Sequence, residues 1–295
     1  MPRRPASRHT RKRTWELRPS VTVMAGPVVF VGGYSWSGEA LRSMVRPAGA
    51  PPEGVVRPGE YRSAAAERSP SVTAGAPPEG VVRPGEYRSA AAERSPSVTA
   101  GARPVVVPTA AMFEGTGPAI DAVCQLLGSS DVDIVSIPRR IPPTDAAVNA
   151  TLAAARLIVF PGESAIHLRS VLADTQAWDA VLQAWANGAI LVGIGGAAAA
   201  LADPMIDDRG GAFTLGLGVV TETAVLPHAD RWGHERMLRT TRLVSTGVAL
   251  ITIDDDAALI WSPALGWEAH GNVGVTLNGG AIPLATVPPP SPRVR

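Results

Sequence analysis

The stretch ILVGIGGAAAALADPM, residues 190–205, decides the fold expected for this chain. Its first five residues are apolar or glycine, which is typical of a buried strand, and the alanines after the glycines are typical of a helix. A strand that turns sharply into a helix presents the nucleophile in many hydrolases. The apex of this elbow, residues 193–197, contains no hydroxyl or thiol. Three interpretations follow: a disabled active site, a phosphate-binding turn or a tight connection.

Apolar strands and helices alternate on both sides of this elbow. Strands that are buried on both faces and alternate with helices form a parallel sheet between two helical layers. After residue 213, short strands separated by turns predict antiparallel pairing at a sheet edge. The sequence therefore predicts an α/β fold, a three-layer α/β/α sandwich with a mostly parallel sheet and antiparallel edge strands. The expected parallel strands are 27–33, 104–110, 132–137, 156–160 and 189–194, and the later ones are TLGLGVV, TAVLP, ALITI, AALIW and VGVTLNGG.

The composition is that of a globular protein with a sizeable core, because 45% of the 295 residues are hydrophobic and 18% are charged. No apolar run approaches the ~20 residues needed to cross a membrane, so no membrane partner is expected. Residues 1–20 carry seven basic side chains against one acidic side chain, a balance of +6 within a net charge of +1. The remainder is therefore acidic, which argues against nucleic acid as a partner. The single cysteine, Cys124, excludes an internal disulfide, and we expect a cytoplasmic protein.

Three segments are expected along the chain. Residues 1–25 are predicted to be a basic disordered tail, and residues 26–44 together with 103–290 a single α/β domain. Residues 45–102 form a predicted disordered insertion, in which residues 51–76 recur without change at 77–102. Each copy is rich in Pro, Gly, Ser and charged residues, and two copies are too few to stack into a solenoid.

Six motifs, in the order in which they occur, resemble those of the cyanophycinase and dipeptidase E family of serine peptidases. This family belongs to the class I glutamine amidotransferase-like superfamily, and the resemblance covers residues 26–36 and about 103–283. It implies a flavodoxin-like sheet and a single peptidase-like domain. The motifs are GPVVFVGG (26–33), VVVPTAA (105–111), IVFPGES (158–164), GIGGAA (193–198), GLGVVTETAVLPHADRWGHER (216–236) and TIDDDAALIW (252–261).

The resemblance implies a Ser–His–acid arrangement. In such a site a histidine takes the proton of the attacking serine, and a carboxylate orients the histidine. The serine position falls on Gly195, which cannot attack a substrate. The histidine falls on His228, and the acid on Asp208 or Asp207. Without the resemblance, a structural histidine is the favoured interpretation of His228.

The same resemblance places the groups that would hold the substrate. Backbone N–H groups of Gly196 and of the turn at Gly162 are the expected oxyanion donors. Glu163 and Ser164 replace an amide-bearing pair of the family.

Two arginines align with the family's pocket arginines when a deletion of one residue is allowed. Arg231 and Arg236 are expected either to hold a substrate carboxylate in bidentate fashion or to form ordinary surface pairs.

Two other functions and one other site were weighed against this interpretation. Ser164, beside the glycine loop, is an alternative nucleophile. The run from Gly193 to Ala198 fits the dinucleotide pattern G-x-G-x-x-A, but the acidic residue expected ~20 positions later is missing. The three aspartates at 254–256 resemble a metal cluster, yet neighbouring strand residues face opposite ways, so a strand-end turn or a binding rim is predicted.

We therefore expect a cyanophycinase-like serine peptidase homologue without catalytic activity, since loss of the serine in a comparable triad costs on the order of a million-fold in turnover. It is expected to bind small peptides such as an aspartyl dipeptide and to use no cofactor and no metal. The sequence gives no prediction of the oligomeric state.

Overall fold

The computed structural model of the chain describes residues 25–45, 103–140, 145–207 and 209–292. The predicted tail and the predicted insertion with its two repeats lie, except for their last and first residues, outside the described residues. Asp208, one of the two predicted orienting acids, is also outside them.

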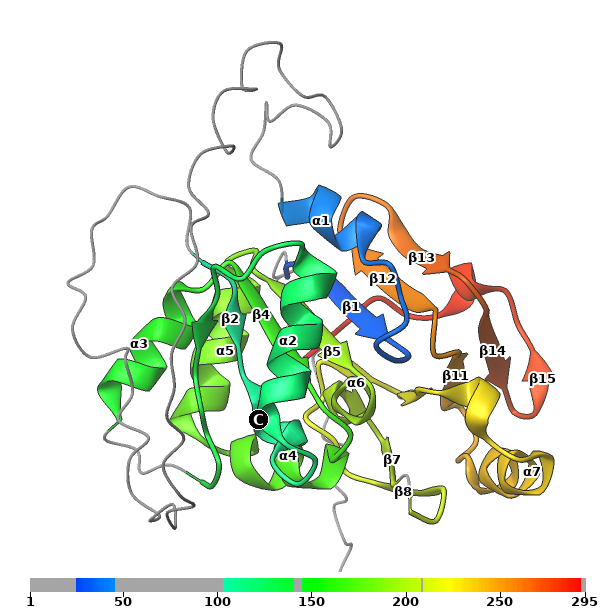
Figure 1. Cartoon of the computed structure of the whole chain (residues 1–295). Helices are drawn as coiled ribbons and strands as arrows, with labels where there is room; N and C mark the ends of the chain where they lie inside the picture. The colour runs from blue at the N-terminus through cyan, green and yellow to red at the C-terminus, as the bar shows by residue number, and fades with distance from the viewer. Residues whose placement is uncertain (1–24, 46–102, 141–144, 208, 293–295) are drawn as a thin grey trace, which may run out of the picture.

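The central sheet has seven strands in the order β13-β12-β1-β5-β4-β2-β3 (Figure 1). Its five strands from β1 to β3 are parallel, while β12 and β13 extend one edge in antiparallel fashion. Counted from β2, the order β3-β2-β4-β5 is the 2-1-3-4 order of a flavodoxin-like sheet, and β1 takes the place of the fifth strand. The predicted mostly parallel sheet is confirmed. The strands are β1 (Val28–Val31), β2 (Val105–Val106), β3 (Asp133–Ile134), β4 (Leu157–Pro161), β5 (Ile190–Ile194), β12 (Ala258–Ser262) and β13 (Gly266–His270).

Helices cover both faces of this sheet, as the sequence predicts. Along β1, Val29 packs with Leu41 of α1 and the apolar side of α2, whereas Phe30 joins the cluster that contains Trp185 of α5. Successive strand residues point to opposite faces, so each strand serves both cores. The helices are α1 (Glu39–Val45), α2 (Thr116–Leu127), α3 (Ala146–Ala154), α4 (Ala165–Leu172), α5 (Gln176–Ala186) and α6 (Gly196–Leu201), with the short 3₁₀ segment η1 (Pro108–Ala111) after β2.

A second sheet of six strands, in the order β15-β14-β11-β10-β6-β9, corrects one expectation. The later strands were expected at the edge of the first sheet, and this is right for β12 and β13 only. Val225 and Ile251 of the second sheet pack in the same apolar cluster as α6, so these strands cover α6 instead of extending the first sheet. The strands are β6 (Ala202–Asp203), β9 (Val220–Thr221), β10 (Thr223–Leu226), β11 (Ala249–Ile253), β14 (Val273–Leu277) and β15 (Gly280–Ala281), and β7 (Met205–Asp207) and β8 (Ala212–Thr214) form a separate hairpin.

The ends of strands from both sheets meet where the candidate site lies. The carboxyl ends of β1, β4 and β5 share one edge of the first sheet because these strands are parallel. In the second sheet β10 and β11 are parallel neighbours, so the residues that follow them also share an edge. The segment after β10 continues as η2 (Ala229–Arg231) and α7 (His234–Leu243), and the chain ends with η3 (Leu284–Thr286) among its described elements. No helix in the described ranges is long and apolar enough to span a membrane.

Candidate functional site

Gly195 forms the apex of the elbow between β5 and α6. Its φ of 62° lies in the region that favours glycine. Its backbone N–H donates to the carbonyl of Val31 at 3.0 Å, which ties the elbow to the end of β1. A Cβ atom added to Gly195 would collide with the carboxylate of Glu163. The space for a side chain at the elbow is therefore already filled by a neighbouring residue.

His228 lies opposite the elbow, two residues after the end of β10. Its Nδ1 is 2.6 Å from Oδ1 of Asp255, and its Nε2 is 2.9 Å from Oε2 of Glu163. The His228 side chain is 14% exposed, so it keeps little contact with solvent. Both ring nitrogens are thus committed to carboxylates.

Asp255 is the acid that contacts His228. It follows β11, the parallel neighbour of the strand that precedes His228. Its Oδ2 accepts the hydroxyl of Ser35 at 2.6 Å, and its Oδ1 lies 2.6 Å from Nη2 of Arg231. Its backbone N–H donates to the carboxylate of Asp230 at 2.9 Å. Asp255 is therefore held by groups from both sheets.

Gly33, at the end of β1, allows this network to approach the first sheet. A Cβ atom there would collide with the carboxylate of Asp255 and would lie 2.8 Å from Cε1 of His228. Any larger residue at position 33 would separate the two halves of the site.

Glu163 reaches the site from the turn between β4 and α4. The Oε2 that contacts His228 also accepts the backbone N–H of Gly196 at 3.1 Å. The backbone N–H of Glu163 itself donates to Glu114 at 3.3 Å, and the carbonyl of Gly162 accepts the N–H of Ala197 at 2.9 Å. The carboxylate of Glu163 therefore occupies the predicted oxyanion donor.

The charges of the site favour an imidazolium between two carboxylates. Burial alone would lower the pKa of His228, but the hydrogen bonds and charges of Glu163 and Asp255 outweigh it and raise that pKa. Burial would raise the pKa of Asp255, but the hydrogen bonds from Ser35 and His228 and the charge of Arg231 lower it. Burial, together with the negative charges of Glu163 and Glu114, raises the pKa of the Tyr34 phenol, which stays neutral.

The structure describes only one of the two predicted orienting acids, Asp207, because Asp208 lies outside the described residues. Asp207 ends β7, and its carboxylate accepts the backbone N–H of Arg209 at 3.1 Å rather than contacting His228. The carboxylate that contacts the histidine is that of Asp255, because the parallel pairing of β10 and β11 sets the two residues side by side. The three aspartates at 254–256 lie between the end of β11 and the start of β12, so the predicted strand-end turn is confirmed. The signal that was overlooked is an acidic residue directly after a buried strand.

The other predicted residues have different surroundings. Ser164 precedes α4, its N–H donates to the carbonyl of Ala110 at 3.0 Å, and its side chain makes no capping hydrogen bond. Arg231 is 61% exposed and paired with Asp255. The guanidinium of Arg236 lies 3.7 Å above the ring of Trp232, and its Nε and Nη2 are buried without a hydrogen-bond partner.

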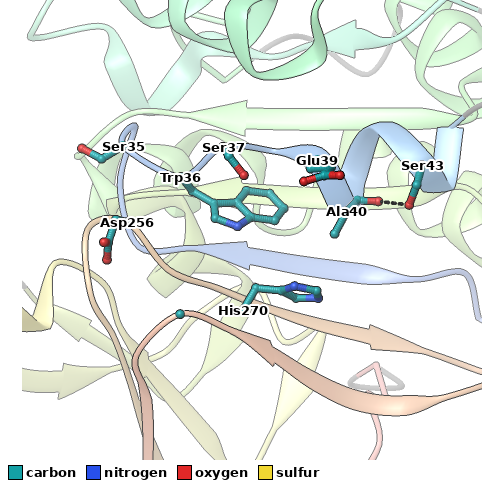
Figure 2. Close-up of a pocket in the computed structure, with 9 residues that line it drawn as sticks. Ser35, Trp36, Ser37, Glu39, Ala40, Ser43, Asp256 and His270 are labelled. Carbon is teal, nitrogen blue, oxygen red and sulfur yellow. Dashed lines mark hydrogen bonds between the residues drawn. The ribbon is translucent and has the colours of Figure 1, made fainter. Parts of the chain in front are cut away.

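A pocket of about 610 Å³ lies beside this network rather than at it, since His228, Asp255 and Glu163 are not among its lining residues. Figure 2 shows the side chains that line the pocket. It shares two segments with the site, because Ser35 and the turn after β11 border both. Asp255 contacts His228, whereas its neighbour Asp256 lines the pocket. None of the predicted site residues lines it. Its walls are formed by Ser35, Trp36, Ser37, Glu39, Ala40, Ser43, Asp256, His270 and Gly271. Within the described ranges, no group of three or more His, Cys, Asp or Glu residues is arranged to hold a metal ion.

Comparisons with known proteins agree with the resemblance. The model of peptidase family S51, the family of dipeptidase E and cyanophycinase, matches residues 88–263, more than half of the chain. A crystal structure of a peptidase from an acI-B1 actinobacterium shares the fold with a TM-score of 0.56 and 19% identity, over 88% of this chain and 97% of that one. A putative peptidase E from Listeria monocytogenes EGD-e gives a TM-score of 0.48 and 11% identity, over 86% and 98% of the two chains. No curated protein matches the chain.

Proposed function

Because the chain belongs to peptidase family S51, we propose that it is a member without serine-peptidase activity, whose cleft binds small peptides. The observation that carries this proposal is the elbow, where Gly195 supplies neither a hydroxyl nor space for one. A serine peptidase needs a nucleophile that a base can deprotonate. In a comparable triad, what remains without the serine is on the order of 10³–10⁴ over water, from binding and the oxyanion hole.

The state of His228 supports the same proposal. A general base must be neutral to accept a proton, and its partner must lie within hydrogen-bond distance. The Nε2 of His228 faces a carboxylate rather than a hydroxyl, and the pKa of the ring is raised by its two acidic neighbours, although burial opposes this. While this contact is in place, Nε2 is occupied and does not reach the hydroxyl of Ser164 or of another nucleophile.

Arg236 supports peptide binding. One edge of its guanidinium, Nε and Nη2, has no hydrogen-bond partner in the structure. This is the edge that binds a carboxylate with two parallel hydrogen bonds. Arg231, the other predicted anchor, is occupied by Asp255. We therefore assign the carboxylate of an acidic dipeptide to Arg236.

The test of lost activity compares three forms of the full chain on aspartyl dipeptides and β-aspartyl-arginine. The natural protein and Gly195→Ser are expected to show no turnover, because the new hydroxyl meets the carboxylate of Glu163. The double variant Gly195→Ser/Glu163→Ala frees that space and is expected to gain at least ~100-fold over background, a small part of what a serine contributes. Turnover by the natural protein contradicts the proposal, and its loss in Ser164→Ala would identify the other nucleophile.

The test of peptide binding uses calorimetry with an aspartyl dipeptide. Arg236→Gln is expected to weaken binding ~10-fold or more, as loss of a charge-assisted bidentate pair requires. Arg239→Gln, on the exposed side of the same helix α7, is the matched control and should bind as the natural protein does. Equal loss in both variants, or tight binding of a nicotinamide dinucleotide in place of the peptide, would overturn this part of the proposal.

A further inference from the structure

Glu163 has taken over the contacts that a nucleophile and a substrate oxygen would share. One oxygen atom, Oε2, lies 2.9 Å from Nε2 of His228 and 3.1 Å from the backbone nitrogen of Gly196. The other oxygen, Oε1, is the nearest atom to a side chain built on Gly195. We infer that the space between Gly195 and His228 is a binding site for a carboxylate, and that the side chain of Glu163 is its resident ligand.

The two donors are of the kind that binds an anion. An imidazolium N–H and a backbone N–H that converge on one oxygen form charge-assisted hydrogen bonds, which are stronger than neutral ones. They come from different sheets, since His228 follows β10 and Gly196 follows β5. Preorganised donors of this type stabilise an oxyanion during acyl transfer. In this chain a permanent carboxylate is held in the same way.

The neighbouring charges exclude a second anion while Glu163 is in place. Asp255 contacts the other nitrogen of the ring, and Glu114 accepts the backbone N–H of Glu163. The positive side chain of Arg231 is paired with Asp255. A free carboxylate can therefore enter only where the carboxylate of Glu163 has been removed.

Gly195 and Glu163 consequently form a coupled pair. A side chain at position 195 displaces the carboxylate of Glu163, and a substrate carbonyl directed at Gly196 must displace it too. Glu163 therefore acts as an internal inhibitor of the inherited site. The inference concerns which group fills this site, so it does not depend on the absence of turnover in the natural protein.

The experiment removes the resident carboxylate and offers acetate as the probe. In the full chain, Glu163→Ala is expected to bind acetate at least 10-fold more tightly than the natural protein, in chloride buffer. Acetate should shift the backbone amide resonance of Gly196 and the ring resonances of His228. Glu163→Gln, which fills the space with a neutral group of the same shape, should not bind acetate. Glu268→Ala, which removes an exposed carboxylate on β13, is the matched control and should behave as the natural protein does.

Three results would overturn the inference. They are acetate binding that is equal in Glu163→Ala and the natural protein, binding that leaves Gly196 and His228 unshifted, and no binding to a folded Glu163→Ala. If Glu163→Ala does not fold, the test is the pKa of His228 in Glu163→Gln, which must be lower than in the natural protein. An unchanged pKa would overturn the inference. Because these readouts report binding and protonation, they can fail while the turnover experiment succeeds, and the reverse.

Discussion

The two sheets supply opposite halves of the site, and the two halves differ in the side chains that they present. After β10 and β11, the second sheet holds His228 and Asp255 in contact, at 2.6 Å. After β4 and β5, the first sheet presents Glu163 and Gly195, an acid and a glycine whose side-chain space that acid fills. The histidine–acid pair is built by the parallel pairing of its own strands, so it does not depend on which residue stands at the elbow.

The pair of His228 and Asp255 on the second sheet still needs a hydrogen-bond partner from the first sheet. A buried ring nitrogen without a hydrogen bond is costly, and most buried polar groups are paired. Glu163 supplies that partner to Nε2, so the glycine at position 195 leaves no unpaired nitrogen on His228. The two halves are therefore joined by one carboxylate.

Removing Asp255, the acid on the second sheet, should cause the largest loss of stability. Asp255→Ala leaves His228, Ser35 and Arg231 without their common partner. We expect a loss of about 3 kcal/mol in the free energy of unfolding, measured by urea denaturation, as for a partly buried ion pair that loses one member.

The control for this variant is the next residue of the same turn. Asp256 is exposed and lines the pocket instead of the network, so Asp256→Ala should change the free energy of unfolding by less than about 0.5 kcal/mol. Equal losses in the two variants would show that the turn, and not the contact with His228, is what matters.

Much of this arrangement could be predicted from the sequence. The apolar run at 190–194 followed by small residues identified the parallel sheet and the elbow, because both are local patterns. The motifs around His228 and Glu163 made both residues candidates for the site, and the structure brings the two side chains into contact. The strands and the elbow could be predicted because each depends on residues close together in the chain.

Three features depended on tertiary placement and were missed. The aspartates at 254–256 were considered only as a metal cluster, whereas the contact of Asp255 with His228 arises because β10 and β11 are parallel neighbours. The contact of Glu163 with His228 joins residues 65 apart, and only the packing of two sheets brings them together. The division into two sheets was missed for the same reason, since strand composition does not reveal which neighbour a strand pairs with.

A side chain at Gly195, on the first sheet, should cause a smaller loss of stability. Gly195→Ala places a Cβ atom on a residue with φ of 62° and displaces the carboxylate of Glu163. We expect a loss of about 2 kcal/mol in the free energy of unfolding. In the Glu163→Ala background the collision is absent, so the two substitutions should be non-additive by about 1 kcal/mol in a double-mutant cycle.

Gly117→Ala is the control for this effect, because a Cβ atom there meets no other atom within 4 Å. It should leave stability unchanged or raise it slightly, since alanine favours the helix α2 more than glycine does. Additivity of Gly195→Ala with Glu163→Ala would show that the collision contributes nothing and that backbone strain alone is responsible.

The smallest expected effect is the pH dependence of the free energy of unfolding, which arises from the protonation of His228 and Asp255. The pKa of this ring is raised above 6.5, so its contribution to stability is complete below pH 6.5 and is lost as the pH rises through the higher pKa of the folded state. The pKa of Asp255 is lowered below 3.8, so its contribution is present above that pH and is lost as the pH falls through the lower pKa of the folded state. Between these limits both contributions are complete, and each unit of pKa shift corresponds to about 1.4 kcal/mol.

The two carboxylates can be separated by NMR titration of the His228 ring. Burial opposes the charged ring, and the hydrogen bonds and charges of Glu163 and Asp255 together overcome it. Glu163→Gln and Asp255→Asn should therefore each lower the pKa of His228. An unchanged pKa in Glu163→Gln would place the proton with the second sheet alone, and Glu163 would then fill space at Gly195 without holding a charge on the ring.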